Sequence, residues 1–459
     1  MVRLEEHKTE TENKAIEKMP QPSKVYIPLS QHLGKICEPQ VKIGDYVFTG
    51  QRIGSAQANV YAPIHASVSG KITSIQEWPH PVLGRGKSIV IENDGQDKSQ
   101  IPNPKSQIEI DNLTAEQIRN IVLEAGIVGM GGASFPTYIK LNPPKPVDTL
   151  IINGAECEPY LTGDYRLMVE KTKEILQGIE LVARCLGIKQ VYIAIEDNKP
   201  EAIKRFSILD SRFSVKVLKS QYPQGGEKQL IKNILGREVP QGKLPFDIGV
   251  VVHNVATVFA VYEAVYLNKP LYERVVTVAG SCISNPKNLL VRIGTPIKDL
   301  IDFCGPLKEE PAKIIIGGPM MGIAQFSDKV PVIKSTTGIL LFNKKIAFGD
   351  NSKVRFSACP GLVFWQARVV RKVLYTFLHH KKEAVFNEEL PCIRCGACVR
   401  ECPVFLMPSL ISLASEKGLW SQAKIYGASD CIECGLCNYV CPANIRLVHH
   451  IKRAKIEVK

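Results

Sequence analysis

Two stretches near the C-terminus repeat one cysteine pattern: CIRCGACVRECP (residues 392–403) and CIECGLCNYVCP (residues 431–442). Each stretch has the spacing CxxCxxCxxxCP, which is the ligand run of bacterial two-cluster [4Fe–4S] proteins. In that pattern three closely spaced thiolates bind one cluster and the fourth cysteine reaches the other cluster. The spacing therefore predicts one cluster on Cys392, Cys395, Cys398 and Cys441, and a second on Cys431, Cys434, Cys437 and Cys402.

Zinc is the competing interpretation, because tetrahedral thiolate sites also suit that metal. Zinc needs only four ligands, however, and gives no role to a third cysteine followed by Cys-Pro that occurs twice. Between the runs, the segment FLMPSLISLASEKGLWSQAKIYGAS (residues 405–429) predicts two short helices with a turn at Gly418, which favours a helical ferredoxin-like unit. The remaining cysteines are scattered and are interpreted as free thiols: Cys37, Cys157, Cys185, Cys282, Cys304 and Cys359.

Length and composition indicate a soluble chain of about three domains. Of its 459 residues 45% are hydrophobic and 22% are charged, which is ordinary for globular proteins. We expect no transmembrane helix, and the polar N-terminus lacks the apolar core of a signal peptide. A net charge of +13 suits an anionic membrane surface, an acidic protein or anionic cofactors. Nucleic acid is not expected, because no reading module is present and the lysines are spread along the chain.

The N-terminal quarter predicts a charged tail at residues 1–24 and a small β domain at residues 25–95. In the latter, short β-branched runs are broken by Gly and Pro. The segments GDYVFTGQRIG (44–54) and APIHASVSGKI (62–72) resemble the barrel-sandwich fold of lipoyl and biotinyl carriers. The segment SAQANVYAP (55–63) replaces the carrier lysine, so we interpret the module as structural.

Residues 106–270 alternate helical and β patterns, which predicts a mostly parallel α/β sheet. Thr114 and Gln117 form a capping box at the start of a helix that leads into the glycine loop GIVGMGGASFPTYIK (126–140). The buried strand TLIINGAE then delivers Asn153 and Glu156 to its carboxyl end. The acidic residue of the Rossmann fingerprint is not found, so a standard dinucleotide fold is not predicted. Residues 271–342 resemble the β-grasp module found beside flavin sites.

Four segments resemble, in order, the flavin and NADH loops of the flavoprotein subunit of bacterial respiratory complex I: GMGGASFPTYIK, NGAECEP, GGEK and HNVAT. The resemblance implies that glycine backbone and a lysine meet the FMN phosphate, and that amide, hydroxyl and carboxylate groups meet the flavin, ribityl or nicotinamide atoms. The implied cofactor-binding residues are Gly129, Gly131, Gly132, Phe135, Lys140, Asn153, Glu156, Glu158, Gly226, Glu227, Asn254 and Thr257. Phe135 could stack on a nicotinamide or adenine ring, although for any single aromatic residue a place in the core is the more common interpretation. Lys228 replaces a second glutamate of complex I, which leaves the nicotinamide contacts open.

Over residues 8–342 and 389–459 the chain is similar to the RnfC family of the Rnf complex, an ion-translocating ferredoxin:NAD oxidoreductase. The resemblance implies a multidomain α+β chain: an N-terminal β barrel-sandwich, a central α/β flavin/NADH-binding domain, a β-grasp module and a C-terminal helical two-cluster ferredoxin domain at residues 389–459. It implies FMN and two [4Fe–4S] clusters as cofactors and NAD(H) as substrate. It also implies a peripheral position on the cytoplasmic face of the cell membrane beside other subunits, with ferredoxin as an indirect partner. The alternatives are a soluble relative that reduces another acceptor, such as a corrinoid, and a scaffold with an empty flavin site.

Residues 343–388 lie outside this similarity and predict a basic insertion. Within GLVFWQARVVRKVLYTFLHHKK (361–382), Arg368, Arg371 and Lys372 stand at helical spacing. Such a helix can bind an anionic membrane or an acidic partner. A surface helix packed on its own protein is an equally good interpretation.

Overall fold

The computed structural model describes residues 2–210, 212–345 and 389–458. The chain divides into two compact units, residues 1–341 and residues 342–459, which are considered separately. The predicted basic helix with Arg368, Arg371 and Lys372 lies outside the described residues.

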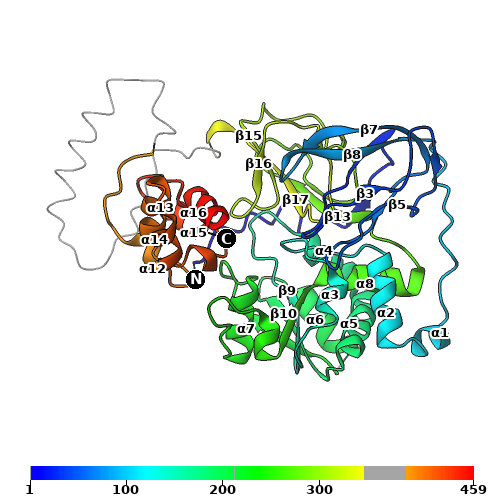
Figure 1. Cartoon of the computed structure of the whole chain (residues 1–459), viewed down its shortest axis with the longest axis horizontal. Coiled ribbons are helices and arrows are strands. Elements are labelled where there is room, and N and C mark those ends of the chain that lie inside the picture. The colour runs from blue at the N-terminus through cyan, green and yellow to red at the C-terminus, as the bar shows by residue number, and fades with distance from the viewer. Residues whose placement is uncertain (1, 211, 346–388, 459) are drawn as a thin grey trace. The chain divides into compact units, whose positions relative to one another are not determined.

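The predicted barrel-sandwich module is confirmed and consists of two small antiparallel sheets, drawn in blue in Figure 1. One sheet has the order β2 (Lys24–Pro28), β8 (Gly84–Asn93), β7 (Gly70–His80) and β4 (Tyr46–Val47). The other contains β3 (Glu38–Pro39), β5 (Arg52–Ser55) and β6 (Ile64–His65). Between them the side chains of Val25, Ile27, Ile53, Ile72 and Ile89 are completely buried.

The charged N-terminal segment is packed onto the first unit, although its sequence predicts a tail. Its strand β1 (Ile16–Lys18) pairs in parallel with β14 (Lys287–Arg292). Lys8 and Thr11 are buried, and the Asn288 amide donates a hydrogen bond of 3.0 Å to the Thr11 carbonyl. A charged composition predicts an exposed segment. Here the polar groups are buried because they find hydrogen-bond partners in strands that are distant in the sequence.

The central sheet is parallel throughout and has the order β11 (Ser214–Leu218), β10 (Gln190–Glu196), β9 (Thr149–Gly154) and β12 (Val250–Asn254). The helices α2 (Ala115–Glu124), α5 (Thr172–Leu186) and α8 (Val255–Leu267) pack against one another beside it, as Figure 1 shows. The predicted capping box is confirmed at Thr114 and Gln117. After β9 the chain forms β10 and β11 on one side of that strand, and it forms β12 on the other side. The crevice at the carboxyl ends of β9 and β12 is therefore a topological switch point.

The β-grasp module extends a six-stranded sheet in the order β1, β14, β13 (Glu273–Ala279), β17 (Gly338–Phe342), β15 (Lys313–Ile316) and β16 (Ile323–Gln325). One helix, α9 (Ile297–Phe303), buries Ile297, Leu300 and Ile301 against this sheet. Alternating aliphatic residues in β13 and β14 supply the rest of this core.

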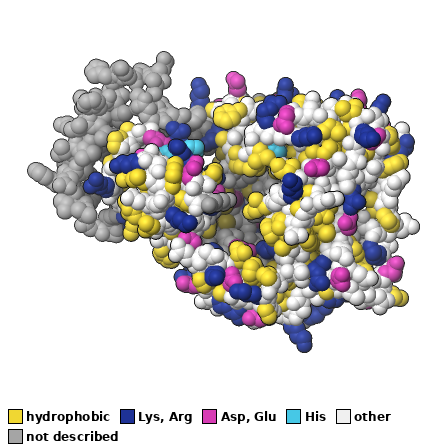
Figure 2. Space-filling model, in the orientation of Figure 1, with side chains coloured by type: hydrophobic (Ala, Val, Ile, Leu, Met, Phe, Trp, Pro, Cys, Tyr) yellow, Lys and Arg dark blue, Asp and Glu magenta, His cyan; other side chains and the backbone are white. Residues whose placement is uncertain are grey.

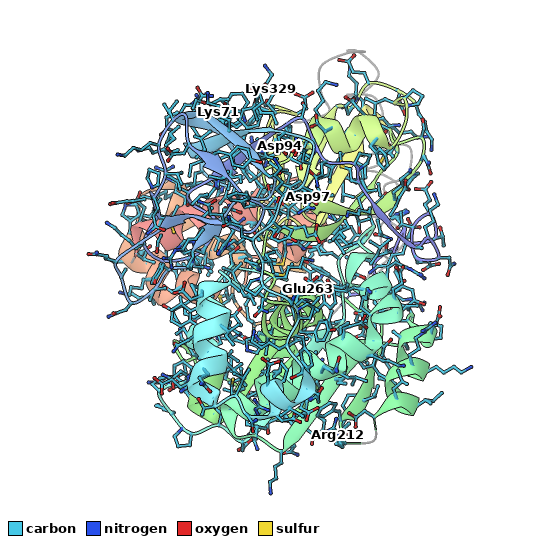
Figure 3. All side chains as sticks on the ribbon, turned by 90° about the vertical axis from the view of Figure 1, so that its right-hand side faces the viewer. Lys71, Asp94, Asp97, Arg212, Glu263 and Lys329 are labelled. Atoms are coloured by element: carbon cyan, nitrogen blue, oxygen red, sulfur yellow. The ribbon has the colours of Figure 1, made fainter. Side chains whose placement is uncertain are left out.

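A partly buried ion-pair network joins the three modules of the first unit. Lys269 contacts Glu263 of α8 and lies 2.6 Å from Glu273 of β13. Arg292 of β14 lies 2.7 Å from Asp97, which follows the barrel sandwich. In Figure 3, Asp97 is placed between the barrel sandwich and Glu263. Breaking one partner of such a network leaves a buried charge unpaired, so it fixes the arrangement of the modules.

The second unit is helical around the two cysteine runs, as predicted. It contains α12 (Ala397–Arg400), α13 (Pro408–Glu416), α14 (Trp420–Ile425), α15 (Leu436–Tyr439) and α16 (Leu447–Glu457). The predicted helix pair between the runs is α13 and α14, and Gly418 forms the turn with a φ of +67°. Ile411, Ala423, Leu447 and Ile451 make its small core.

Three further features concern membrane-spanning helices, the distribution of surface charge and the scattered cysteines. Among the described residues, no helix is long and apolar enough to cross a membrane. On the face in Figure 2, the Lys and Arg side chains are distributed among hydrophobic ones rather than gathered in one field. The five scattered cysteines that the structure describes form no disulfide, and Cys359 lies outside the described residues.

Candidate functional site

Two of the predicted asparagines meet at the switch point of the central sheet. Asn153, near the end of β9, is paired directly with Asn254, the last residue of β12. The Asn254 Oδ1 atom accepts hydrogen bonds from the N–H groups of Ala256 (2.9 Å) and Thr257 (3.3 Å), so Asn254 caps the N-terminus of α8. The Asn153 amide donates to the carbonyl of Gly225 at 2.9 Å. The NGAECEP, GGEK and HNVAT segments therefore share one edge of the sheet, because parallel strands end together.

The glycine loop lies over the same helix N-terminus. It closes on itself through a 2.9 Å hydrogen bond from the Gly129 N–H to the Phe135 carbonyl. The Met130 N–H donates to the Thr257 hydroxyl at 3.0 Å, which holds the loop against α8. A helix N-terminus with exposed backbone N–H groups is a favourable place for a phosphate. Side-chain contacts and strand ends thus bring together the loop and the polar residues that the sequence predicts to hold FMN.

The glycines of the loop differ in what surrounds them. A Cβ atom on Gly131 would lie 2.8 Å from the Asn254 Nδ2 atom, so the protein itself requires glycine there. A Cβ atom on Gly132 would meet no protein atom within 4 Å, and the φ of Gly132 does not lie in the left-handed region. Packing and backbone strain therefore give no reason for glycine at position 132. Space left beside an exposed backbone fits close approach of a phosphate.

Lys140 and Glu227 form an ion pair at the edge of this region. The Lys140 Nζ atom lies 3.0 Å from the Glu227 carboxylate and donates to the Val252 carbonyl at 2.6 Å. Glu227 is the first residue of α7 (Glu227–Leu235), and Gly226 is its N-cap. The predicted cation thus reaches the carboxyl end of β12 with an acidic partner. The Phe135 side chain is half-buried in the loop.

Asp164 belongs to this site and was missed by the sequence analysis. Its Oδ2 atom accepts a 2.6 Å hydrogen bond from the Asn254 amide. Both oxygens of Glu156 accept from backbone N–H groups at the start of α4 (Gly163–Glu170), those of Asp164 (2.7 Å) and Tyr165 (3.1 Å). Burial, and then the nearby Glu156 carboxyl group, raise the pKa of Asp164 to about 7. The available signal was an acidic residue in the first turn of a helix shortly after NGAECEP.

The Glu158 side chain links the NGAECEP segment (153–159) to the β-grasp module. Its carboxylate accepts from the N–H groups of Met320 (3.0 Å) and Met321 (2.9 Å), and from the Tyr222 hydroxyl (3.4 Å). A Cβ atom on Gly318 would come within 2.2 Å of this carboxylate, which explains the glycine. Burial raises the pKa of Glu158 to about 6. Its predicted contact with the dinucleotide stays a prediction, as does that of Glu156.

The two cysteine runs fold into the same backbone shape. Positive φ angles recur at equivalent places: Arg394 (+55°) and Glu433 (+58°), Gly396 (+72°) and Gly435 (+81°), and Phe405 (+57°) and Asn444 (+53°). In two of these three pairs neither residue is glycine, and other residues adopt such angles mainly when the surrounding structure imposes them. The repeat seen in the cysteine spacing is therefore a repeat of loop conformation.

Four thiols line one open pocket of the second unit. They are those of Cys402, Cys431, Cys434 and Cys437. These thiols surround the pocket. Among the described residues, however, no three His, Cys, Asp or Glu side chains are arranged to hold a metal ion. The Leu406 N–H points at the Cys402 Sγ atom (3.3 Å) and the Glu433 N–H at the Cys431 Sγ atom (3.4 Å). Thiol ligands around a cavity, with N–H groups aimed at sulfur, fit an iron–sulfur cluster.

Burial raises the pKa of three thiols of this second set, those of Cys431, Cys434 and Cys437. It raises the pKa of the Cys434 thiol to about 11, because a thiolate is poorly solvated there. Ligation requires thiolates, so cluster assembly must release these protons. In the first set, Cys392 and Cys395 are exposed and Cys398 and Cys441 are half-buried.

Comparisons with protein families cover most of the chain. Residues 2–96 match the RnfC barrel sandwich hybrid domain and residues 122–263 match the Nuo51 FMN-binding domain. Residues 275–324 match the SLBB domain and residues 391–445 match the 4Fe-4S dicluster domain. The chain thus has an FMN-binding domain and a dicluster domain with the eight predicted cysteines.

Whole-chain relatives are equivalent subunits of ion-translocating complexes. The chain is 44% identical to its counterpart in the proton-translocating ferredoxin:NAD(+) oxidoreductase complex of Clostridium ljungdahlii, over 99% of this chain and 93% of the relative. It is 42% identical to the counterpart in the Na(+)-translocating ferredoxin:NAD(+) oxidoreductase complex of Acetobacterium woodii, over 95% and 91%. It is also 42% identical to the counterpart in the ion-translocating oxidoreductase complex of Rhodobacter capsulatus, over 98% and 81%. With this identity along nearly its whole length, the chain belongs to the RnfC family of the ion-translocating ferredoxin:NAD oxidoreductase complexes.

Proposed function

We propose that this chain passes electrons between NAD(H), FMN and two [4Fe–4S] clusters within a membrane-associated Rnf complex. The single observation that carries the proposal is the meeting of the glycine loop, Asn153 and Asn254 at the switch point of the parallel sheet. Bound FMN would supply the chemistry, exchanging a hydride with nicotinamide and single electrons with the clusters. The protein would supply position and electrostatics, so no catalytic acid, base or nucleophile is proposed.

Each part of the site has a distinct proposed role. Gly129 would close the loop, and the backbone N–H groups of Gly131 and Gly132 would approach the phosphate at the N-terminus of α8, where the helix dipole favours negative charge. Asn153, Asn254 and Thr257 would hydrogen-bond the flavin and its ribityl chain. Lys140 would add a positive charge near the phosphate. Gly226 and Glu227 would border the dinucleotide, with Phe135 as a stacking surface and Glu156 and Glu158 as further contacts.

Asp164 would act as a positioning residue for Asn254. Its carboxyl group holds the Asn254 Nδ2 atom at 2.6 Å, while the Asn254 Oδ1 atom is occupied by α8. The side-chain amide is therefore fixed in orientation before the cofactor binds. Preorganised hydrogen bonds reduce the reorganisation that binding requires.

The clusters would occupy the two sets of cysteines as the spacing predicts. The cavity supports placing Cys402 with Cys431, Cys434 and Cys437, although Cys402 belongs to the other run. The remaining set would be Cys392, Cys395, Cys398 and Cys441.

The family supports a proposal for the position in the cell. Its members are subunits of multi-subunit complexes, so we propose a peripheral place on the cytoplasmic face of the membrane, with ferredoxin acting through other subunits. We also propose domains at residues 25–95, 106–270, 271–342 and 389–459.

The proposal is tested on the whole chain, purified and reconstituted without oxygen. One non-covalent FMN per chain, bleaching of bound FMN by NADH and subsequent reduction of the iron–sulfur absorption are expected. Retention of FMN without bleaching by NADH would refute the nicotinamide role. Isolation of the native chain without other subunits, at any salt concentration, would favour a soluble reductase of another acceptor.

A further inference from the structure

A buried lysine of the β-grasp module lies where the glycine loop begins. Lys334 is 1% exposed and belongs to the segment between β16 and β17. Its Nζ atom donates hydrogen bonds to the Gly126 carbonyl at 2.6 Å and to the Pro63 carbonyl at 2.7 Å. Gly126 is the first residue of the glycine loop, and Pro63 belongs to the barrel sandwich. One side chain thus ties the glycine loop to the two other modules of the first unit.

The burial of Lys334 is not compensated by an acidic partner. It makes no ion pair with any residue that the structure describes, and its Nζ hydrogen bonds go to the two carbonyl groups. Burial lowers the pKa of Lys334 to about 7, because its ammonium group is removed from water. A buried cation of this kind costs stability. Such departures from the rules of folding concentrate at functional sites, so Lys334 is a candidate for a role in the flavin region.

The chain enters the glycine loop through a turn that packs against the same two groups. Helix α2 ends in a Schellman motif, in which the N–H groups of Gly126 and Ile127 return to carbonyls of the last turn. Gly126 has a φ of +66°. A Cβ atom on Gly126 would lie 2.3 Å from the Pro63 carbonyl oxygen and 2.8 Å from the Lys334 Nζ atom. These contacts fix the direction in which the loop leaves α2.

The barrel sandwich also holds the later part of the loop. The Leu33 N–H donates to the Ser134 carbonyl at 3.2 Å. The Tyr138 hydroxyl, on the short helix α3 (Thr137–Lys140), donates to the Asn59 carbonyl at 2.6 Å. The glycine loop is therefore held at its beginning, in its middle and at its end by groups outside the α/β domain.

The segment SAQANVYAP (55–63) gains a role from these contacts. It stands where a carrier protein has its lysine-bearing hairpin. Here Pro63 lies at the start of the glycine loop, and Asn59 accepts a hydrogen bond from its end. A loop that is already ordered loses less conformational freedom when a ligand binds, so it binds that ligand more tightly.

We propose that Lys334 and the segment 55–63 position the glycine loop for the phosphate group of FMN. Lys334 is then a positioning residue, since it acts through the loop and does not touch the cofactor. The proposal rests on the flavin role proposed for the loop above. Its effect is confined to the phosphate end of the flavin, so riboflavin, which lacks the phosphate, should not gain from it.

The test compares FMN with riboflavin on the full chain after removal of its flavin, by quenching of flavin fluorescence. Lys334→Met removes the amine and keeps an unbranched side chain. Tyr138→Phe removes only a hydroxyl group, and it tests the loop independently if Lys334→Met fails to fold. Lys105→Met is the matched control, because the Lys105 Nζ atom donates to the Val265 carbonyl at 3.2 Å, near the C-terminus of α8 and away from the loop.

Lys334→Met and Tyr138→Phe should each raise the dissociation constant of FMN about three- to tenfold, as expected for the loss of one hydrogen bond that orders the loop. The dissociation constant of riboflavin should stay within about twofold of wild type in both variants. Lys105→Met should leave both flavins within about twofold, because distant sites act independently.

Three outcomes would overturn the proposal: unchanged FMN affinity in either loop variant, equal weakening of FMN and riboflavin, or an equal loss of FMN affinity in Lys105→Met. Equal weakening of the two flavins would mean that the contacts only support the fold. A failure of the proposed function is recognised separately, because the wild type would then bind neither flavin.

Discussion

Replacing Gly132 by valine should abolish FMN binding without destabilising the protein. A Cβ atom at this position meets no protein atom within 4 Å, so the substitution should change the free energy of unfolding of the apoprotein by less than about 0.5 kcal/mol, as for other surface changes. The same side chain would occupy the space where a phosphate approaches the backbone N–H groups above α8.

The magnitude follows from the hydrogen bonds that would be lost. A hydrogen bond to a charged group contributes about 1.5–3 kcal/mol, so losing two N–H contacts to the phosphate removes about 3–6 kcal/mol. At 1.4 kcal/mol for each factor of ten, the dissociation constant of FMN should rise about 10²- to 10⁴-fold.

The assay is titration of FMN into deflavinated protein, followed by quenching of flavin fluorescence, together with denaturant unfolding of the apoprotein. Gly131→Ala is the contrasting variant, since its Cβ would lie 2.8 Å from the Asn254 Nδ2 atom and should lower both FMN affinity and apoprotein stability. Unchanged FMN affinity in Gly132→Val would refute the role given to the loop. A large loss of apoprotein stability would refute the assumption that this position faces open space.

Further predictions concern the clusters, one buried carboxyl group and the basic insertion. Anaerobic reconstitution should yield about eight irons and eight sulfides per chain; zinc without sulfide would contradict this. Cys402→Ala should eliminate the spectroscopic signal of the cluster on the second loop, and Cys441→Ala that of the cluster on the first loop. Because the folded pKa of Glu158 is raised to about 6 from 4.5, its contribution to stability is present below pH 4.5 and lost as pH rises through 6. The loss amounts to about 2 kcal/mol, so Glu158→Gln should reduce the fall in unfolding free energy between pH 4.5 and 7 by this amount. Deleting residues 346–382 should preserve FMN, clusters and NADH oxidation with a soluble dye, while the subunit leaves its complex at lower salt.

Local signals in the sequence predicted the elements of this structure well. The capping box at Thr114, the glycine turn at Gly418 and the β-branched runs before residue 95 each depend on neighbouring residues only, and each is present. The pattern of two-cluster ferredoxins also predicts that Cys402 belongs with the later run, because the fourth cysteine of each run binds the other cluster. The cavity that these thiols line is consistent with that pairing.

Contacts between distant segments could not be predicted in this way. The N-terminal segment reads as a charged tail, yet Lys8 is buried and donates a hydrogen bond to the Glu156 carbonyl. The link from Glu158 to Met320 and Met321 likewise joins two modules. Burial of polar groups depends on partners that sequence order does not bring together.

The sequence by itself thus determined the modules, the family and the residue types of the two cofactor regions, since spacing and periodicity are properties of the chain. Only the tertiary structure decided that Asp164 fixes Asn254, that Gly132 faces open space and that Lys334 reaches the glycine loop. These properties arise where strands β9 and β12 end together, and where modules that are distant in the sequence meet. A pattern specifies which groups are available, but distance and burial decide what each group can do.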